Sequence, residues 1–323
     1  MASRRLFIRF LSFPILLFLL HMLGFAYAHY GRWAQLARNP LFVVRQDPEP
    51  FLPLYLDYLS NFLRGDWGLQ PGTNVVSLRD LIVQAGLASG GLILIAFLIS
   101  AILGGIIGLM AIRTEPPGVA KWVIPISTIS LAMPGFYIGA TIITASVFYL
   151  LYSPTASRGL PYPLGGFGWD DHLILPVLTL TIRPTMQIAQ TTATLLTNEL
   201  RAMYVTAARS LGYSWRRVIW RAALKNVLAA VVLTIASSLR MIVGEVILVE
   251  TLFGWPGLGR LFAMSIRPPD VANIFGATLP ANFLHPPLIA LLATAFGLFF
   301  LLIDLISTVL TKWADPRLRG SKA

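Results

Sequence analysis

Six long, mostly apolar blocks set the strongest limit on what this chain can fold into. They are Leu6–Ala28, Gly86–Ile112, Trp122–Tyr152, Leu173–Thr197, Val227–Leu252 and Leu288–Leu310. About 20 apolar residues in a helix cross the ~30 Å hydrocarbon layer of a bilayer, because each residue rises 1.5 Å. Only 12% of the residues are charged, against about 25% in an ordinary soluble domain. The pattern predicts an all-α integral membrane protein with about six transmembrane helices in one membrane domain.

The distribution of charge predicts the orientation. If both termini lie in the cytoplasm, the cytoplasmic segments hold fifteen of the 25 Lys and Arg residues and the outer loops hold eight. An excess of Lys and Arg marks the cytoplasmic side. The net charge of +11 therefore follows the topology, and we expect no nucleic-acid partner.

The start of the chain allows two interpretations. Ala26-Tyr27-Ala28 resembles a signal-peptidase site, but the apolar block before it spans about 23 residues, longer than the 7–15 of a signal sequence. We therefore expect residues 1–28 to be a retained transmembrane helix. We expect residues 29–85 to form an extracytoplasmic segment with a short helix within Phe51–Leu63, and residues 86–323 to form the core.

Residue types that carry chemistry are scarce. The chain has no cysteine and four scattered histidines, which excludes disulfides, thiolate catalysis and the H-E-x-x-H type of metal site. The sequence lacks a G-x-x-x-x-G-K-[ST] phosphate loop and a Ser-His-Asp grouping. We expect no catalytic residue, metal or cofactor. Gly104 and Gly108 fit a G-x-x-x-G pattern inside an apolar block, which favours close helix packing.

Residues 198–226 are the most informative segment. They hold six basic residues and one acid. Gly212 marks a turn between two predicted helices, Glu199–Leu211 and Ser214–Leu228, and Ser214 is a plausible N-cap. A basic amphipathic helix on anionic lipid and a docking element for a cytoplasmic partner fit these residues equally well.

The same segment resembles the cytoplasmic loop of bacterial ABC importer permeases, whose pattern is E-A-A, three residues and Gly. Here Thr206-Ala207-Ala208 precedes Gly212, with Thr206 in place of the Glu. The family pattern continues with I-x-L-P, and of this second part only Leu224 is present here. The form Y-V-x-x-A-x-x-x-G, typical of the dipeptide and oligopeptide branch, fits better. Further elements of that branch are similar to Arg64–Gly68, Met133–Gly139, His172–Pro176, Val249–Gly259 and Asp315–Arg319.

This resemblance implies a B-type permease subunit with the type I ABC importer fold. Its implied partners are a second, C-type permease, two cytoplasmic ATP-binding subunits that hydrolyse the ATP, and an extracytoplasmic solute-binding protein. The implied location is the bacterial inner membrane, where the chain also contacts membrane lipid. The residues implied to couple to the ATPase are Tyr204, Ala207, Ala208, Gly212 and Leu224. Peptides are the expected solutes. Nickel complexes, glutathione and oligosaccharides are alternatives within the family, and a secondary transporter, a channel or a membrane scaffold are alternatives outside it.

Charges inside the apolar blocks are candidates for gating or for the solute pathway, because an ionisable group in a bilayer is costly and usually faces protein or water. Arg240 and Glu245 lie about 140° apart around a helix, so we expect Arg240 to reach Asp304, the surroundings of Arg183 or a partner subunit instead. Arg183 and the proline after it predict a kink that faces the interior. The candidates are Arg183, Arg240, Glu245, Glu250, Pro256 and Gly257.

Overall fold

The computed structural model describes residues 2–38, 49–71, 75–153, 159–267 and 282–314. The chain divides into two compact units. Unit 1 comprises Met1–Ser89 with Pro256–Leu301, and unit 2 comprises Gly90–Trp255 with Leu302–Ala323. Two helices, α3 (Leu78–Met110) and α12 (Pro286–Ala314), pass from one unit to the other. Each unit is described by itself below.

Unit 1 contains α1 (Ala2–Arg38), α2 (Phe51–Leu63), α10 (Leu258–Ile266) and the first parts of α3 and α12. The predicted short helix after the first span is confirmed as α2. Its aromatic side chains pack on α1, where Phe25 and Tyr55 are buried. His21 Nδ1 lies 3.1 Å from the Tyr55 hydroxyl. Gly24 lets α1 approach α12, because a Cβ atom there would lie 3.1 Å from Ala293 Cβ.

The connection from α2 to α3 contains the Arg64–Gly68 element. Gly65 and Gly68 adopt φ angles of +92° and +84°, which only glycine adopts readily. The Gly68 amide donates to Asp66 Oδ1 at 2.9 Å. The short G-D-W-G stretch is therefore a backbone turn that delivers the chain into α3.

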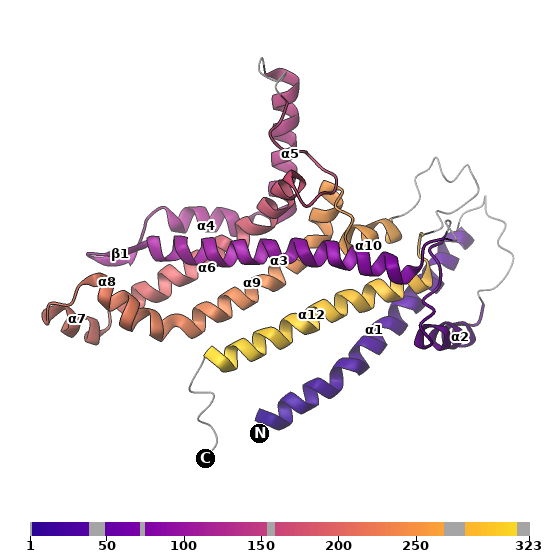
Figure 1. The fold of residues 1–323 in the computed structure, drawn as a ribbon, viewed down its shortest axis with the longest axis horizontal. Coiled ribbons are helices and arrows are strands. Elements are labelled where there is room, and N and C mark those ends of the chain that lie inside the picture. Colours follow the sequence, from indigo (N-terminus) through magenta and orange to yellow (C-terminus); the bar gives the residue numbers. More distant parts are fainter. Residues whose placement is uncertain (1, 39–48, 72–74, 154–158, 268–281, 315–323) are drawn as a thin grey trace. The chain divides into compact units, whose positions relative to one another are not determined.

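Unit 2 is built around α6 (Ile174–Leu200) and α9 (Leu224–Phe253), which lie side by side (Figure 1). Around them are α4 (Val123–Ala132), α5 (Gly135–Tyr152), the short helices α7 (Met203–Ser210) and α8 (Trp215–Val218), and the 3-10 turn η2 (Asp171–Leu173). A π-helical turn, η3 (Ile219–Ala223), joins α8 to α9 without a break. The strands β1 (Ile112–Thr114) and β2 (Pro117–Val119) form an antiparallel hairpin with Arg113 opposite Gly118.

The G-x-x-x-G pattern packs as predicted. A Cβ atom on Gly104 would lie 2.7 Å from Ile188 Cβ, and one on Gly108 would lie 2.7 Å from Thr192 Cβ. Real Cβ atoms do not approach so closely, so α3 and α6 are in contact only because both positions are glycine. Gly105 has open space beside it.

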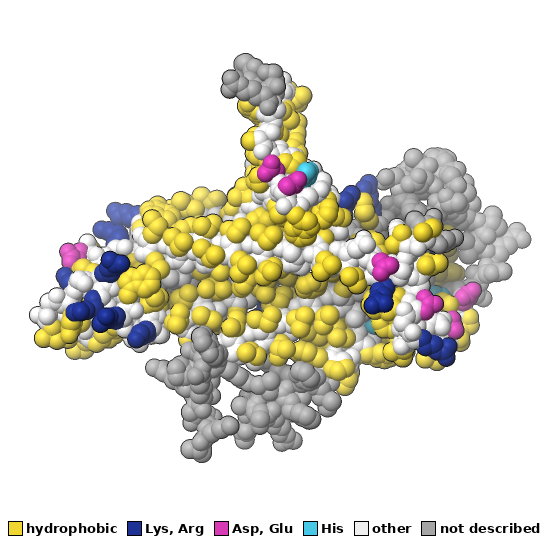
Figure 2. All heavy atoms as spheres, viewed as in Figure 1, with side chains coloured by type: hydrophobic (Ala, Val, Ile, Leu, Met, Phe, Trp, Pro, Cys, Tyr) yellow, Lys and Arg dark blue, Asp and Glu magenta, His cyan; other side chains and the backbone are white. Residues whose placement is uncertain are grey.

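Five helices of described residues are long and apolar enough to cross a membrane: Ser12–Ala37, Leu78–Met110, Gly135–Tyr152, Trp215–Phe253 and Pro286–Leu310. Hydrophobic side chains cover the exposed flanks of the long helices (Figure 2). The predicted span at 173–197 corresponds to α6, which is not among the five because threonines, glutamines and an arginine interrupt it. Protein surrounds much of α6, including Leu180, Ile188 and Leu196, so its polar groups do not need to face lipid.

The predicted third span is corrected. Trp122–Tyr152 is two helices, because Met133 is extended with ψ of 128° and Pro134 precedes the first residue of α5. Proline disfavours helical geometry in the residue before it, and here the break is complete. The Asp315–Arg319 element lies outside the described residues.

Candidate functional site

The segment between α6 and α9 forms the predicted helix–turn–helix, with one change. Residues 199 and 200 belong to α6, and the first short helix, α7, begins only at Met203, because Ala202 is extended with ψ of 147°. Gly212 has φ of +83°, and its amide donates to the Arg209 carbonyl at 2.9 Å. This left-handed glycine ends α7 in the way that many helices end.

The second half of the segment matches the prediction at its start. Ser214 has the extended backbone of an N-cap, and its hydroxyl oxygen accepts from the Arg217 amide at 3.4 Å. From Trp215 the helix runs without interruption to Phe253. The turn at Gly212 thus connects a short helix directly to one of the membrane-spanning helices.

α7 has one packed side and one open side. Val205 is buried and, with Ala208 and Leu224 beside it, packs in a cluster that includes Leu196 and Val218. The open side carries Met203, which is 90% exposed, Leu211, which is 76% exposed, and Ala207 between them. Successive positions four apart lie on one face of a helix. The stripe formed by these three residues is therefore exposed and apolar, with a small side chain at its centre.

Tyr204 ties the segment to both long helices. Its hydroxyl donates to Glu199 Oε1 at 2.8 Å, and Asn226 Nδ2 donates to the same oxygen at 2.7 Å. Burial, with the hydrogen bond to Glu199 as a second cause, raises the pKa of Tyr204 to about 12. The hydroxyl is thus a donor at any physiological pH, and it holds α7 against the ends of α6 and α9.

The β-hairpin braces the segment from the other side. Glu115 at its turn accepts a hydrogen bond from Trp215 Nε1 at 2.7 Å and lies 3.7 Å from Arg209 Nη2. The Arg209 guanidinium also lies 4.6 Å from the centre of the Trp215 ring. Arg201 donates to the Pro117 carbonyl at 3.2 Å. This support was not predicted; the sequence signals it only through the Pro-Pro-Gly turn and a single acid between Arg113 and Lys121.

The charges inside the spans fall into separate groups. Arg183 of α6 and Glu245 of α9 form an ion pair, with side chains 20% and 12% exposed. Arg183 Nη2 also donates to the Leu131 carbonyl at 3.2 Å, and the Glu245 carboxylate lies against Gly135, so a side chain on that glycine would collide with it. The pair therefore occupies the break between α4 and α5. Both residues are among the predicted candidates, but their pairing was not predicted.

The other candidates lie elsewhere. Arg240 Nη2 is 3.5 Å from Asp304 Oδ1, and both side chains are about half exposed. Asp304 is thus confirmed as one of the expected partners of Arg240, while Glu245 pairs with Arg183. Glu250 is fully buried near the end of α9, where Gly254 has φ of +70° and closes the helix. Pro256 is exposed, and Gly257 is the extended residue before α10.

The loop 159–170 covers that end of α9 within unit 2. The Gly166 amide donates to the Phe253 carbonyl at 2.8 Å. Phe167 and Trp169 meet the fully buried Trp255 edge to face, with ring centres 4.8 and 5.5 Å apart. The Val249–Gly259 element thus contains the end of α9, where aromatic side chains of the loop 159–170 pack on Trp255.

Comparison with known proteins identifies the family. Residues 102–320 match the family described as binding-protein-dependent transport system inner membrane component. The chain belongs to this family. The match covers α6, the helix–turn–helix, α9 and α10, so the family segment contains the whole candidate site. The resemblance to ABC importer permeases and the all-α membrane fold are confirmed, and the protein is a multi-pass membrane permease component.

Curated relatives extend the similarity beyond the family segment. The oligopeptide transport system permease protein OppB of Haemophilus influenzae is 25% identical over 84% of this chain and 81% of its own length. The glutathione transport system permease protein GsiC of Escherichia coli is 28% identical over 94% of both chains. The oligopeptide transport system permease protein AppB of Bacillus subtilis is 28% identical over 72% of this chain and 73% of its own.

Proposed function

We propose that this permease forms half of the translocation pathway of an ATP-driven importer of di- and oligopeptides. The proposal is supported by its relatives, which are named as oligopeptide and glutathione transport permeases. Glutathione is itself a tripeptide, so these names share one solute chemistry. Glutathione is the second candidate solute, favoured by the match to GsiC over 94% of both chains.

The proposed topology places both termini and the 198–226 loop in the cytoplasm. Lys and Arg side chains gather at the end of unit 2 that carries α7, α8 and the hairpin (Figure 2), as expected for a cytoplasmic end. In this arrangement residues 1–28 are the N-terminal transmembrane helix, residues 29–85 are extracytoplasmic, and residues 86–323 form the core. We propose the cytoplasmic membrane of a bacterium as its location, which the bacterial sources of its relatives support.

The proposed partners are a second, C-type permease, two ATP-binding subunits and an extracytoplasmic solute-binding protein. The observation that carries the coupling role is the exposed face of α7 beside Gly212. A partner protein can approach this face closely, because Ala207 has a small side chain. A Cβ atom added to Gly212 would have no atom within 4 Å. Hydrolysis would occur in the partners, since this sequence has no phosphate loop.

The proposed mechanism is a transfer of motion. ATP-driven closure of the partner subunits displaces α7, and the braces at Tyr204, Trp215 and the hairpin make the displaced segment move as one body. Rocking of the attached helices then alternates access to the pathway. The Arg183–Glu245 pair at the α4–α5 break, Arg240, Glu250 and the Pro256-Gly257 turn are the proposed gating residues.

Uptake of a labelled tripeptide in cells that lack the chromosomal copy tests this proposal. Gly212→Trp should abolish uptake without loss of membrane-inserted chain, because the indole occupies the space that the partner needs. Gly212→Asn should retain uptake, because asparagine tolerates a positive φ. Gly65→Trp is the matched control, since Gly65 also has a positive φ and open surroundings but lies outside the loop. Normal uptake by Gly212→Trp would refute the coupling role.

A second experiment addresses the partners and the solute. Purification of the chain in mild detergent should recover an ATPase, a second permease and a binding protein, and recovery of the chain alone would favour a channel or secondary transporter. Excess unlabelled di- and oligopeptides of other sequences should compete with the labelled tripeptide. If labelled glutathione is taken up and the other tripeptide is not, the second candidate solute replaces the first.

A further inference from the structure

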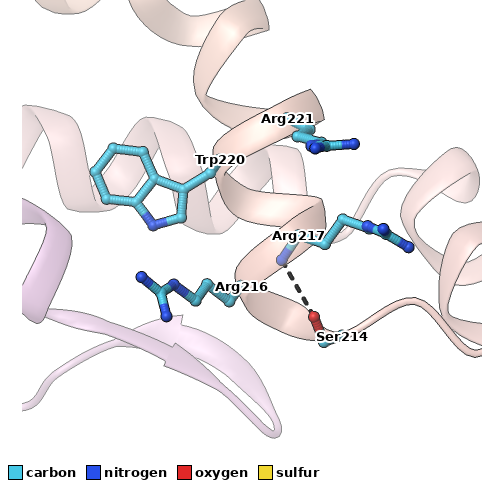
Figure 3. Close-up of a pocket in the computed structure, with 5 residues that line it drawn as sticks. All are labelled: Ser214, Arg216, Arg217, Trp220 and Arg221. Atoms are coloured by element: carbon cyan, nitrogen blue, oxygen red, sulfur yellow. Dashed lines mark hydrogen bonds between the residues drawn. The ribbon is translucent and has the colours of Figure 1, made fainter.

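A basic groove lies at the start of the helix that follows Gly212. Its lining residues are Ser214, Arg216, Arg217, Trp220 and Arg221, and its volume is about 300 Å³. Arg216 and Trp220 form one flank and Arg217 and Arg221 the other (Figure 3), because residues four apart share a helix face. Three arginine side chains, on both flanks of the helix, thus line one surface concavity.

The positive charge of this groove is not neutralised within the described part of the chain. None of the ion pairs seen there involves Arg216, Arg217 or Arg221. Two acids that contact this part of the structure are already engaged, since Glu115 accepts from Trp215 and Glu199 accepts from Tyr204 and Asn226. The groove therefore offers guanidinium donors to an anion from outside the chain.

The groove lies beyond the hydrocarbon layer. The helix from Trp215 to Phe253 has 39 residues and is about 58 Å long, almost twice the ~30 Å hydrocarbon thickness. Its first two turns, which carry the three arginines, extend past the apolar layer on the cytoplasmic side in the proposed orientation. Trp220 is 54% exposed there, and tryptophan prefers the level of the lipid headgroups.

We propose that this groove binds the phosphate of an anionic phospholipid in the cytoplasmic leaflet. Paired guanidinium forks match the geometry of phosphate oxygens. The Ser214 hydroxyl accepts from the Arg217 amide, which leaves its own proton free to donate. Trp220 supplies an apolar surface that can contact the glycerol region of a lipid. A free phosphate ion has no such region. The assignment rests on the proposed orientation of the loop but not on which solute is transported.

Native mass spectrometry of the full-length chain in neutral detergent tests the assignment. We expect dioleoyl-phosphatidylglycerol to bind and dioleoyl-phosphatidylcholine not to compete with it. Each basic residue near an anionic surface contributes about fivefold, so Arg217→Gln/Arg221→Gln should weaken phosphatidylglycerol binding roughly twentyfold. The matched control is Arg113→Gln/Lys121→Gln, which removes the same charge from the exposed side of the hairpin region and should change binding less than about twofold.

Three outcomes would overturn the assignment. Equal weakening by both double variants would reduce it to general attraction between charges. Displacement of the lipid by millimolar inorganic phosphate would show a site for a soluble anion. Unchanged lipid binding with loss of the co-purifying ATPase in Arg217→Gln/Arg221→Gln would assign these arginines to a protein contact. Because lipid binding is measured without transport, failure of peptide uptake leaves this result unaffected.

Discussion

Replacement of Gly104 by alanine tests the close contact between α3 and α6 in unit 2. The added Cβ atom would lie 2.7 Å from Ile188 Cβ and 2.9 Å from the Thr185 carbonyl oxygen, about 1 Å closer than carbon atoms normally pack. Overpacking of this kind costs about 1–3 kcal/mol. Alanine also gains about 1 kcal/mol over glycine in a helix interior. The expected net change is a loss of roughly 0–2 kcal/mol.

Gly105→Ala is the matched control, because it lies next in the same helix with open space beside it. It should gain the helix propensity alone, about 1 kcal/mol. The two variants should therefore differ by about 1–3 kcal/mol, or roughly 2–10 °C in melting temperature for a unit of this size. The measurement is the fraction of a fluorescently tagged full chain that stays monodisperse in detergent after heating. Equal shifts for both variants would refute the close approach of α3 and α6.

Three further predictions concern the charges and caps. Arg183→Gln and Glu245→Gln should each lower thermal stability by about 3–5 kcal/mol, and replacement of both by apolar residues should restore most of it; a double-mutant cycle in the same heating assay checks this. Ser214→Ala should cost about 1 kcal/mol, seen as faster amide exchange confined to the start of α8. Since the pKa of Tyr204 is raised from 10 to about 12, its hydrogen bond to Glu199 is fully present below pH 10 and lost as the pH rises towards 12. The absorbance difference between wild type and Tyr204→Phe at alkaline pH should titrate accordingly, and a midpoint near 10 would contradict it.

Local signals made part of this structure predictable. α2 occupies the predicted range because Pro50 and Gly65 mark its ends, and Ser214 caps a helix because its side chain acts on the adjacent turn. The Gly104 and Gly108 contact followed from residue size alone. The ends of α2 and the cap at Ser214 have their physical cause within a few residues, and the glycine spacing that permits the helix contact can be read within five residues.

Other features depend on relations between distant segments. The Arg183–Glu245 pair depends on how α6 and α9 are rotated relative to each other. The periodicity of residues within one helix does not give this rotation. The hydrogen bond from Trp215 to Glu115 joins residues 100 positions apart. Pro134 is compatible with either a kink or a break, and the packing around Gly135 decides for a break. The coupling and gating roles of the candidate residues stay predictions.

The uninterrupted helix from Trp215 to Phe253 also has a mechanical consequence. A helix is stiff along its axis, so a displacement at Trp215 can be transmitted along it to Gly254. The π-helical turn at Ile219–Ala223 is the exception, because it holds one extra residue in a wider turn. Its conversion to α-helix would rotate everything beyond it by about 100° and advance it by about 1.5 Å. The helix can therefore transmit a translation along its axis if the π-helical turn is kept, or a rotation about its axis if that turn converts to α-helix.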